Sequence, residues 1–239
     1  MRRDDLITTI RAVLDKTSTY RSDAFLISQI NYGQKLICTL TLFYEQRDTV
    51  SITGGRNYIP LPKEGNDSCI APLYVANTNT GARVNYVSID EMEFYATQWE
   101  GRNATDSLYY TLLNPFHDAF SCIVVCPYQT AETMEFSFVG AYEHNGLSSD
   151  SAEPVLPEEY QDLLVLYTIF QCFIGEPNRV KDALASFKQF MTRLNQYIAS
   201  LKARFPSGRD FEPYSTEFSY DIITEQEQTA QKVEKKNER

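Results

Sequence analysis

The sequence predicts an α+β fold, in which helices from both ends of the chain form a bundle and a β-rich segment is inserted between them. Three observations support this prediction. Apolar residues recur at helical spacing in residues 1–48 and again in residues 154–205. Between them, in 49–153, short runs of β-forming residues alternate with stretches rich in Gly, Asn and Asp. The last segment, 206–239, has neither pattern and is expected to be an extended C-terminal arm.

Two helices are expected in the N-terminal segment. The first follows Asp4 and Asp5, whose carboxylates suit the positive end of a helix dipole. The second is longer and has Ser22 or Asp23 as its N-cap residue. Its apolar stripe consists of Leu26, Ile27, Ile30, Ile37, Leu40 and Tyr44. Gly33 lies inside this helix at a cost of about 1 kcal/mol in helix propensity, which predicts that a neighbouring element packs closely against it.

The inserted segment predicts a β-sandwich or a small barrel-like domain, because several short strands follow one another at close spacing. Gly54-Gly55 divides the first β-forming run and predicts a hairpin there, and the prolines that follow favour an edge position. One or two helical turns are expected within residues 88–100. Five further stretches are expected to contain strands: 69–77, 83–89, 107–113, 120–128 and 135–143.

The C-terminal segment predicts two helices joined by a short connection, which favours an antiparallel hairpin. Pro157 suits the first position of the first helix, and Gly175 ends it. The first stripe consists of Tyr160, Leu163, Leu164, Tyr167, Phe170 and Ile174. The second stripe consists of Val180, Ala183, Leu184, Phe187, Met191, Leu194, Tyr197, Ile198 and Leu201. Because these stripes need partners, the N- and C-terminal helices should pack on each other.

Charge and composition argue against a nucleic-acid-binding surface. The chain has a net charge of −10, and residues 49–150 carry 4 basic and 12 acidic residues. An acidic face of this kind repels DNA rather than holding it. The chain is also rich in aromatic residues, with 16 Tyr and 14 Phe, which suit broad contacts with other proteins.

The five cysteines predict free thiols rather than a disulfide framework or a zinc site, because they are odd in number and scattered along the chain. Cys122 and Cys126 lie in an apolar run that suits buried thiols. The N-terminus lacks the apolar stretch of a signal peptide, and no stretch approaches the roughly 20 apolar residues of a membrane span. We therefore expect synthesis in a reducing cytoplasm, with no cofactor, no metal site and no membrane contact.

Candidate catalytic residues have simpler structural interpretations. His117 and Asp118 could form a base with its orienting carboxylate, but adjacent residues on a strand point to opposite faces. His144, next to Asn145-Gly146, is interpreted as a turn residue. The acidic residues from Asp90 to Glu93 lack the ligand spacing of a calcium loop and suit the start of a helix. No catalytic residue is therefore expected.

The C-terminal arm contains the residues that we expect to bind a partner. Five apolar side chains stand among polar ones in this segment: Phe211, Tyr214, Phe218, Tyr220 and Ile222. The last three alternate with polar residues as in a strand, so the arm could bind by adding a strand to a sheet. The remaining residues, 224–239, have almost nothing to bury.

The order of these segments resembles the head-to-tail adaptor family of podovirus-type tailed bacteriophages, also called connector or head-completion proteins. The resemblance covers residues 4–205 and is carried by YIPLP at 58–62, CPY at 126–128 and LPEEY at 156–160. The stretch TAETMEF at 130–136 differs from the turn with Pro and Gly that this family leads one to expect.

The resemblance implies a virion structural protein without an active site. It implies a dodecameric homo-oligomeric ring beneath the portal protein, with the C-terminal arm reaching along the portal. The lower face would receive the tail tube or nozzle protein, and DNA would pass through the channel without specific binding. The implied location is the head–tail junction of the virion, after synthesis in the host cytoplasm.

Two other functions remain open from the sequence. The first is a carbohydrate- or receptor-binding module that uses the acidic, Tyr-rich segment 49–152 as its recognition face. Glycan binding by that fragment would favour it. The second is an enzyme that uses His117, which would require loss of a defined activity in a folded His117→Ala variant.

Overall fold

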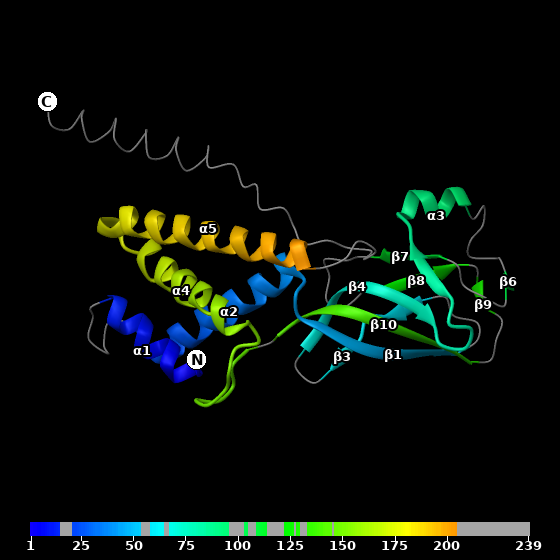
Figure 1. Cartoon of the computed structure of the whole chain (residues 1–239), viewed down its shortest axis with the longest axis horizontal. Helices are drawn as coiled ribbons and strands as arrows, with labels where there is room; N and C mark the ends of the chain where they lie inside the picture. Colours follow the sequence, from blue (N-terminus) through cyan, green and yellow to red (C-terminus); the bar gives the residue numbers. More distant parts are fainter. Residues whose placement is uncertain are drawn as a thin grey trace, which may run out of the picture.

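The computed structural model describes residues 1–14, 21–53, 58–64, 67–95, 103–104, 109–113, 122–126, 128–129, 133–144 and 146–204. Helices dominate one end of the molecule and a β-sheet the other (Figure 1). This arrangement confirms the α+β class. No helix in the described part of the chain has the length and apolar character that a membrane span requires.

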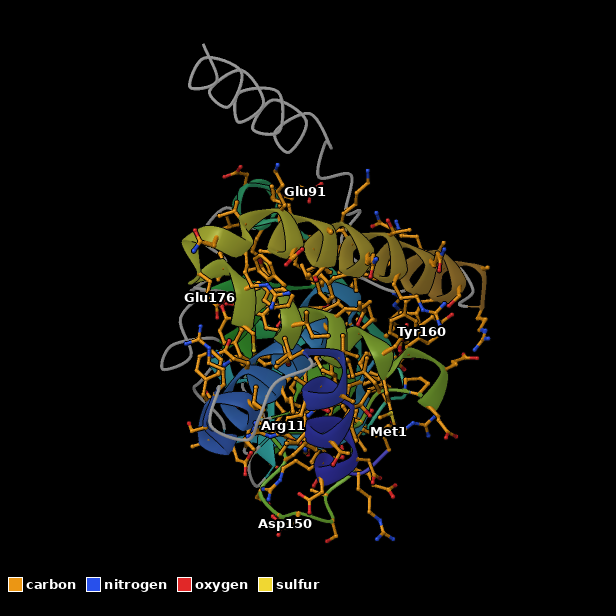
Figure 2. The ribbon with its side chains drawn as sticks, turned by 90° about the vertical axis from the view of Figure 1, so that its left-hand side faces the viewer. Met1, Arg11, Glu91, Asp150, Tyr160 and Glu176 are labelled. Carbon is orange, nitrogen blue, oxygen red and sulfur yellow. The ribbon has the colours of Figure 1, made fainter. Side chains whose placement is uncertain are left out.

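Four long helices form the helical end of the molecule. They are α1 (Arg3–Leu14), α2 (Asp23–Thr41), α4 (Asp162–Ile174) and α5 (Val180–Arg204). Two short 3-10 turns, η2 (Glu158–Tyr160) and η3 (Pro177–Arg179), precede α4 and α5. Figure 2 looks onto this end and shows α4 between α5 on one side and α1 on the other.

The helix boundaries follow from local capping. The Ser22 hydroxyl accepts a hydrogen bond from the Phe25 backbone N–H at 3.2 Å, as expected for an N-cap. Leu42 adopts a left-handed conformation, with φ of 51°, and its N–H donates to the Cys38 carbonyl. Because this conformation ends α2 at Thr41, Tyr44 does not belong to the helical stripe that the sequence assigned to it.

Residues from all four helices share one apolar core. Its fully buried members include Leu6, Ile10, Leu26, Ile30, Ile37, Leu163, Leu164, Cys172 and Leu194. Each large apolar side chain of this kind contributes about 1.5–3 kcal/mol when fully buried. The N- and C-terminal helices therefore pack on each other. Val180, which the sequence placed on the apolar stripe of α5, is instead 49% exposed at the start of that helix.

The chain segments between the helices form a mixed sheet of eight strands. Its strands are β1 (Glu45–Thr53), β2 (Tyr58–Pro60), β3 (Lys63–Glu64), β4 (Asp67–Asn77), β5 (Arg83–Tyr86), β7 (Tyr109–Leu113), β8 (Cys122–Cys126) and β10 (Thr133–Glu143). The order is β1-β10-β4-β5-β7-β8-β2, with β3 paired to β4. The strands pair antiparallel except for β5 with β7. β6 (Asn103–Ala104) and β9 (Tyr128–Gln129) form a separate parallel pair.

The connection from β5 to β7 contains the short helix α3 (Ile89–Tyr95), as the sequence predicted. Two parallel neighbours need such a crossover, because a tight turn can join only antiparallel strands. Met92 of α3 is buried and packs against Val87 and Tyr109. This contact holds α3 at the β7 side of the sheet.

The predicted hairpin around Gly54-Gly55 is wrong. The strands on either side of that turn do not pair with each other: β1 pairs with β10, and β2 pairs with β8. β1 pairs with β10 over nine consecutive residue pairs, and β2 pairs with β8 over three. Both strands therefore find their partners far along the chain and not across the turn. Pro60 does lie in an edge strand, as predicted, while the sandwich or barrel remains a prediction.

Candidate protein-binding surfaces

Several residues that the sequence singled out lie outside the described part of the chain. The five arm residues Phe211, Tyr214, Phe218, Tyr220 and Ile222 are among them, as are His117 and Asp118. β8 contains Cys122 and Cys126, but their side chains are not described. Cys38, Cys69 and Cys172 are buried free thiols.

A cluster of polar side chains lies where the chain crosses between the helices and the sheet. Tyr44 precedes β1, His144 follows β10, and Asp67 begins β4. The Tyr44 hydroxyl donates to Asp67 Oδ2 at 2.9 Å, and His144 Nδ1 lies 2.8 Å from Asp67 Oδ1. Gln46 Nε2 donates to the same Asp67 Oδ2 at 3.1 Å. Asp67 therefore connects strand β4 to the two segments that link the sheet to the helices, one before β1 and one after β10.

The backbone and the rings reinforce this junction cluster, which we define as Tyr44, Gln46, Asp67 and His144. The Tyr142 backbone N–H donates to the Tyr44 carbonyl at 2.8 Å. The rings of Tyr44 and His144 meet edge to face at 6.0 Å. Burial raises the pKa of Tyr44, and its hydrogen bond to Asp67 raises it further, so Tyr44 remains a donor at neutral pH.

The hydrogen bonds of the junction cluster give it a structural role, which is to hold neighbouring segments of the fold together. Both carboxylate oxygens of Asp67 already have partners on this chain. Its side chain is 13% exposed, and that of His144 is 24% exposed. The sequence interpretation of His144 as a turn residue missed its contact with Asp67, because no local pattern links two residues that lie 77 positions apart.

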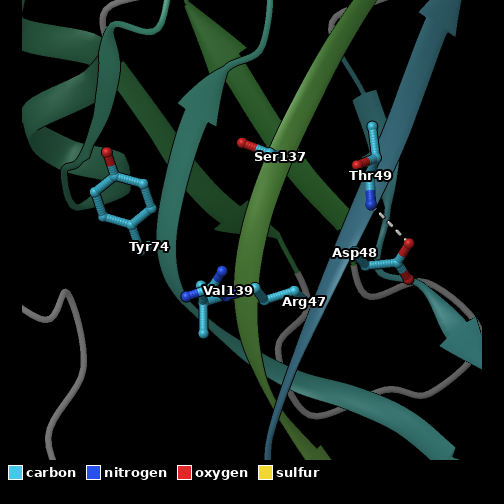
Figure 3. A pocket seen from close by; sticks show the side chains of 6 residues that line it. All are labelled: Arg47, Asp48, Thr49, Tyr74, Ser137 and Val139. Atoms are coloured by element: carbon cyan, nitrogen blue, oxygen red, sulfur yellow. Dashed lines mark hydrogen bonds between the residues drawn. The ribbon is translucent and has the colours of Figure 1, made fainter.

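The exposed face of the sheet is hollowed over β1, β10 and β4 (Figure 3). The hollow has a volume of about 690 Å³ and is lined by Arg47, Asp48, Thr49, Tyr74, Ser137 and Val139. The strand register explains its shape, since Arg47 is opposite Val139 and Thr49 is opposite Ser137. The small Thr and Ser side chains leave space beside the longer Arg and Tyr side chains.

The side chains around this hollow suit contact with a polar or acidic partner. Arg47 is exposed, and the guanidinium of Arg83 lies 5.4 Å from the centre of the Tyr74 ring. The Asp48 carboxylate accepts hydrogen bonds from the Thr49 backbone N–H at 2.7 Å and the Tyr142 hydroxyl at 3.3 Å. These bonds hold Asp48 to its own strand and to β10.

A second, shallower groove follows the outer side of α4 and α5. It is lined by Asp162, Leu166, Ala185, Lys188, Gln189, Thr192, Arg193 and Gln196. Arg193 donates to Asp162 Oδ2 at 3.0 Å and to the Glu159 carbonyl at 2.6 Å. Its guanidinium also lies 5.0 Å from the Tyr160 ring centre. Because these partners lie at the start of α4, Arg193 fixes the antiparallel hairpin that the sequence predicted.

The acidic run at Asp90 forms the start of α3, as the sequence interpretation preferred. Glu91 accepts hydrogen bonds from the Ser88 backbone N–H and hydroxyl, both at 2.9 Å, and Glu91 N–H donates to Ser88 Oγ at 3.2 Å. This reciprocal arrangement is a capping box. The bonds from Ser88 lower the pKa of Glu91. The Glu91 carboxylate thus stabilises its own helix.

Comparison with known families identifies the chain. The family described as SU10 adaptor protein matches residues 1–210, which include every described helix and strand. A search of curated proteins gives no match. The family is one of bacteriophage structural adaptors, so the match agrees with the resemblance recognised in the sequence. The chain belongs to the SU10 adaptor protein family and is a phage structural protein of the virion.

Proposed function

We propose that this protein is a head-to-tail adaptor, which forms a ring beneath the portal protein and connects it to the tail tube or nozzle protein. The observation that carries this proposal is the family match over residues 1–210, because it spans both the helices and the sheet. The packing of N- and C-terminal helices around a common core supports the expected layout of a bundle with an inserted β-domain.

The proposed domains are those expected from the sequence. Residues 1–48 and 154–205 form the bundle, 49–153 form the inserted domain, and 206–239 form the arm. In a ring, one surface of each subunit meets a different surface of the next, and the rotation between them closes the circle. A dodecamer matched to the portal is the proposed assembly. The net negative charge of residues 49–150 supports passage of DNA without specific binding.

The portal-binding element in this proposal is the arm. Its aromatic and apolar residues are Phe211, Tyr214, Phe218, Tyr220 and Ile222. The family match ends at residue 210, so all five lie beyond the part of the chain that the family shares. Side chains of this kind, set among polar residues, are typical of interface anchors. We assign them to a partner-specific contact with the portal.

The protein acts in this proposal by assembly and not by catalysis. Both carboxylate oxygens of Asp67 in the junction cluster are engaged in joining elements of the fold. A general base needs instead to reach a proton of a bound substrate. The cluster therefore supports a role in holding the sheet against the helices.

Co-sedimentation with purified portal rings tests the role of the arm. We expect deletion of 206–239 to abolish co-sedimentation, and replacement of the five arm residues by Ser to weaken it at least tenfold. Deletion of 224–239 alone is the matched control, because it removes polar residues and should leave binding nearly unchanged. Undiminished binding after deletion of the whole arm would contradict the proposed contact.

A further inference from the structure

Strand β1 ends the sheet and leaves one of its own edges open. Among the described strands, β1 pairs only with β10, and it does so over nine residues without a bulge. A regular strand of that length has an edge of roughly 30 Å on its other side, where the Thr49 N–H already donates to the Asp48 carboxylate and the residues after it have no strand partner among those described. Natural proteins usually shorten, bulge or cover such an edge, because it recruits another strand.

The two halves of β1 differ in how well they resist strand pairing. Residues 45–48 include Glu45, Arg47 and Asp48, and charges of this kind discourage pairing. Residues 49–53 read TVSIT, which is uncharged, rich in β-forming residues and free of proline. The second half of β1 is therefore suited to accept another strand.

The sheet core is also incomplete at this edge. Val50 faces the same core cluster as its cross-strand neighbour Phe136, which is 1% exposed. Val50 itself is only partly buried, because no described strand covers its far side. An added strand with apolar side chains on that face would complete the burial of Val50.

We propose that the open edge of β1 is a strand-docking surface and that residues 217–223 of the same chain occupy it in the free protein. These residues read EFSYDII, so Phe218, Tyr220 and Ile222 alternate with Glu217, Ser219, Asp221 and the final Ile223. A strand that places the first set beside Val50 necessarily places the second set on the opposite face.

The charged side chains of the segment and of β1 also suit this placement of the docked strand. The opposite face of β1 exposes Arg47 and Thr49 at the hollow of the sheet (Figure 3). The docked segment brings Glu217 and Asp221 to that face. An antiparallel strand with Phe218 opposite Val50 places Asp221 opposite Arg47, and a parallel strand with Tyr220 opposite Val50 places Glu217 there. The segment is therefore complementary to β1 in both apolar pattern and charge.

The connection is long enough for the segment to reach β1 of its own chain. The ring of Phe43, two residues before β1, lies 5.6 Å from that of Tyr197, near the C-terminal end of α5. Residues 205–216 connect Arg204 to the docking segment and span roughly 40 Å when extended. A tether of this length gives an effective concentration on the order of millimolar, which favours docking within one chain.

This inference is independent of the proposed adaptor function. It concerns the free protein, in which an aromatic segment and an open edge would otherwise both promote aggregation. If a portal binds Phe218, Tyr220 and Ile222, it must first displace them from β1. Portal binding and edge docking therefore compete for the same side chains.

Hydrogen exchange of the β1 amides in the free full-length chain tests the docking. Ser219→Pro removes a backbone donor from the segment without removing an apolar side chain. We expect the edge-facing amides of residues 50–53 to exchange about tenfold faster or more in this variant than in the wild type. Thr229→Pro, in the polar end of the arm, is the matched control and should leave exchange unchanged. Unchanged protection of β10 confirms that Ser219→Pro is folded.

A second experiment supplies the docking segment to β1 as a separate peptide. A synthetic peptide of residues 214–225 should return protection to the β1 amides of the Ser219→Pro variant, whereas the same peptide carrying the proline should not. Equal exchange in wild type and Ser219→Pro would overturn the proposal. Protection that disappears on tenfold dilution would also overturn it, because docking would then occur between copies. Portal co-sedimentation is measured separately, so the two proposals can fail independently.

Discussion

A Cβ atom at Gly33 would lie only 2.8 Å from Cδ1 of Tyr167, so α2 and α4 approach each other where only a glycine fits. The Tyr167 ring has little freedom to move away. It is 4% exposed, stacks against Tyr32 at 6.1 Å and packs against Phe190 at 5.5 Å. The close approach that the sequence predicted at Gly33 is confirmed. This contact joins an N-terminal helix to a C-terminal one.

Gly33→Ala should therefore destabilise the protein despite a gain in helix propensity. Alanine improves propensity by about 1 kcal/mol, but overpacking in a rigid core costs about 1–3 kcal/mol. We expect a net loss of about 1 kcal/mol in the free energy of unfolding, measured in urea. Gly175→Ala is the control, because its Cβ would meet only Arg21 Nη2, at 3.5 Å. Equal or greater stability of Gly33→Ala would contradict the contact.

Asp67→Asn should weaken the junction between helices and sheet. The substitution preserves size but removes the carboxylate that accepts hydrogen bonds from Tyr44 and Gln46 and lies 2.8 Å from His144 Nδ1. We expect a loss of about 1–3 kcal/mol in the free energy of unfolding. Asp90→Asn, at the exposed start of α3, should change stability by less than about 0.5 kcal/mol. A junction variant as stable as this control would show that the cluster is dispensable.

Stability should fall at alkaline pH because of the buried Cys69 thiol. Burial raises its pKa from 9.0 to about 12. Between these values the unfolded chain loses the thiol proton while the folded chain keeps it, so rising pH favours unfolding. The stabilisation is complete below pH 9 and is lost as the pH approaches 12.

The alkaline effect can be assigned to Cys69 by substitution. Cys69→Val keeps an apolar side chain of similar size and removes the titrating group. The free energy of unfolding, measured in urea from pH 8 to 11, should fall less steeply with pH in this variant than in the wild type. Identical slopes would contradict the assignment. A thiol reagent at pH 8 should also label Cys69 only after unfolding.

The helices could be predicted from the sequence because their signals are local. Ser22 caps α2 through a residue three positions away, and the burial of Leu26 and Ile30 follows from helical spacing. Gly33 could be recognised as a contact point because glycine is unfavourable inside a helix. The end of α2 was missed, since nothing in the sequence marks the left-handed conformation of Leu42.

The sheet pairing could not be predicted in the same way. The sequence near Gly54-Gly55 favours a local turn, but β1 pairs with a strand about 90 residues further along the chain. The same limit applies to the junction cluster, whose members Tyr44, Asp67 and His144 come together only when the sheet forms. Such contacts depend on tertiary packing and leave no periodic pattern in the sequence. The partner-binding residues of the arm remain a prediction.

The composition of purified virions tests the adaptor role most directly. If the protein forms a ring matched to the portal, quantitative mass spectrometry of disrupted particles should find it in the same copy number as the portal protein. It should also remain with the portal when heads and tails are separated under mild conditions. Absence from purified virions, or a copy number unrelated to that of the portal, would contradict the account.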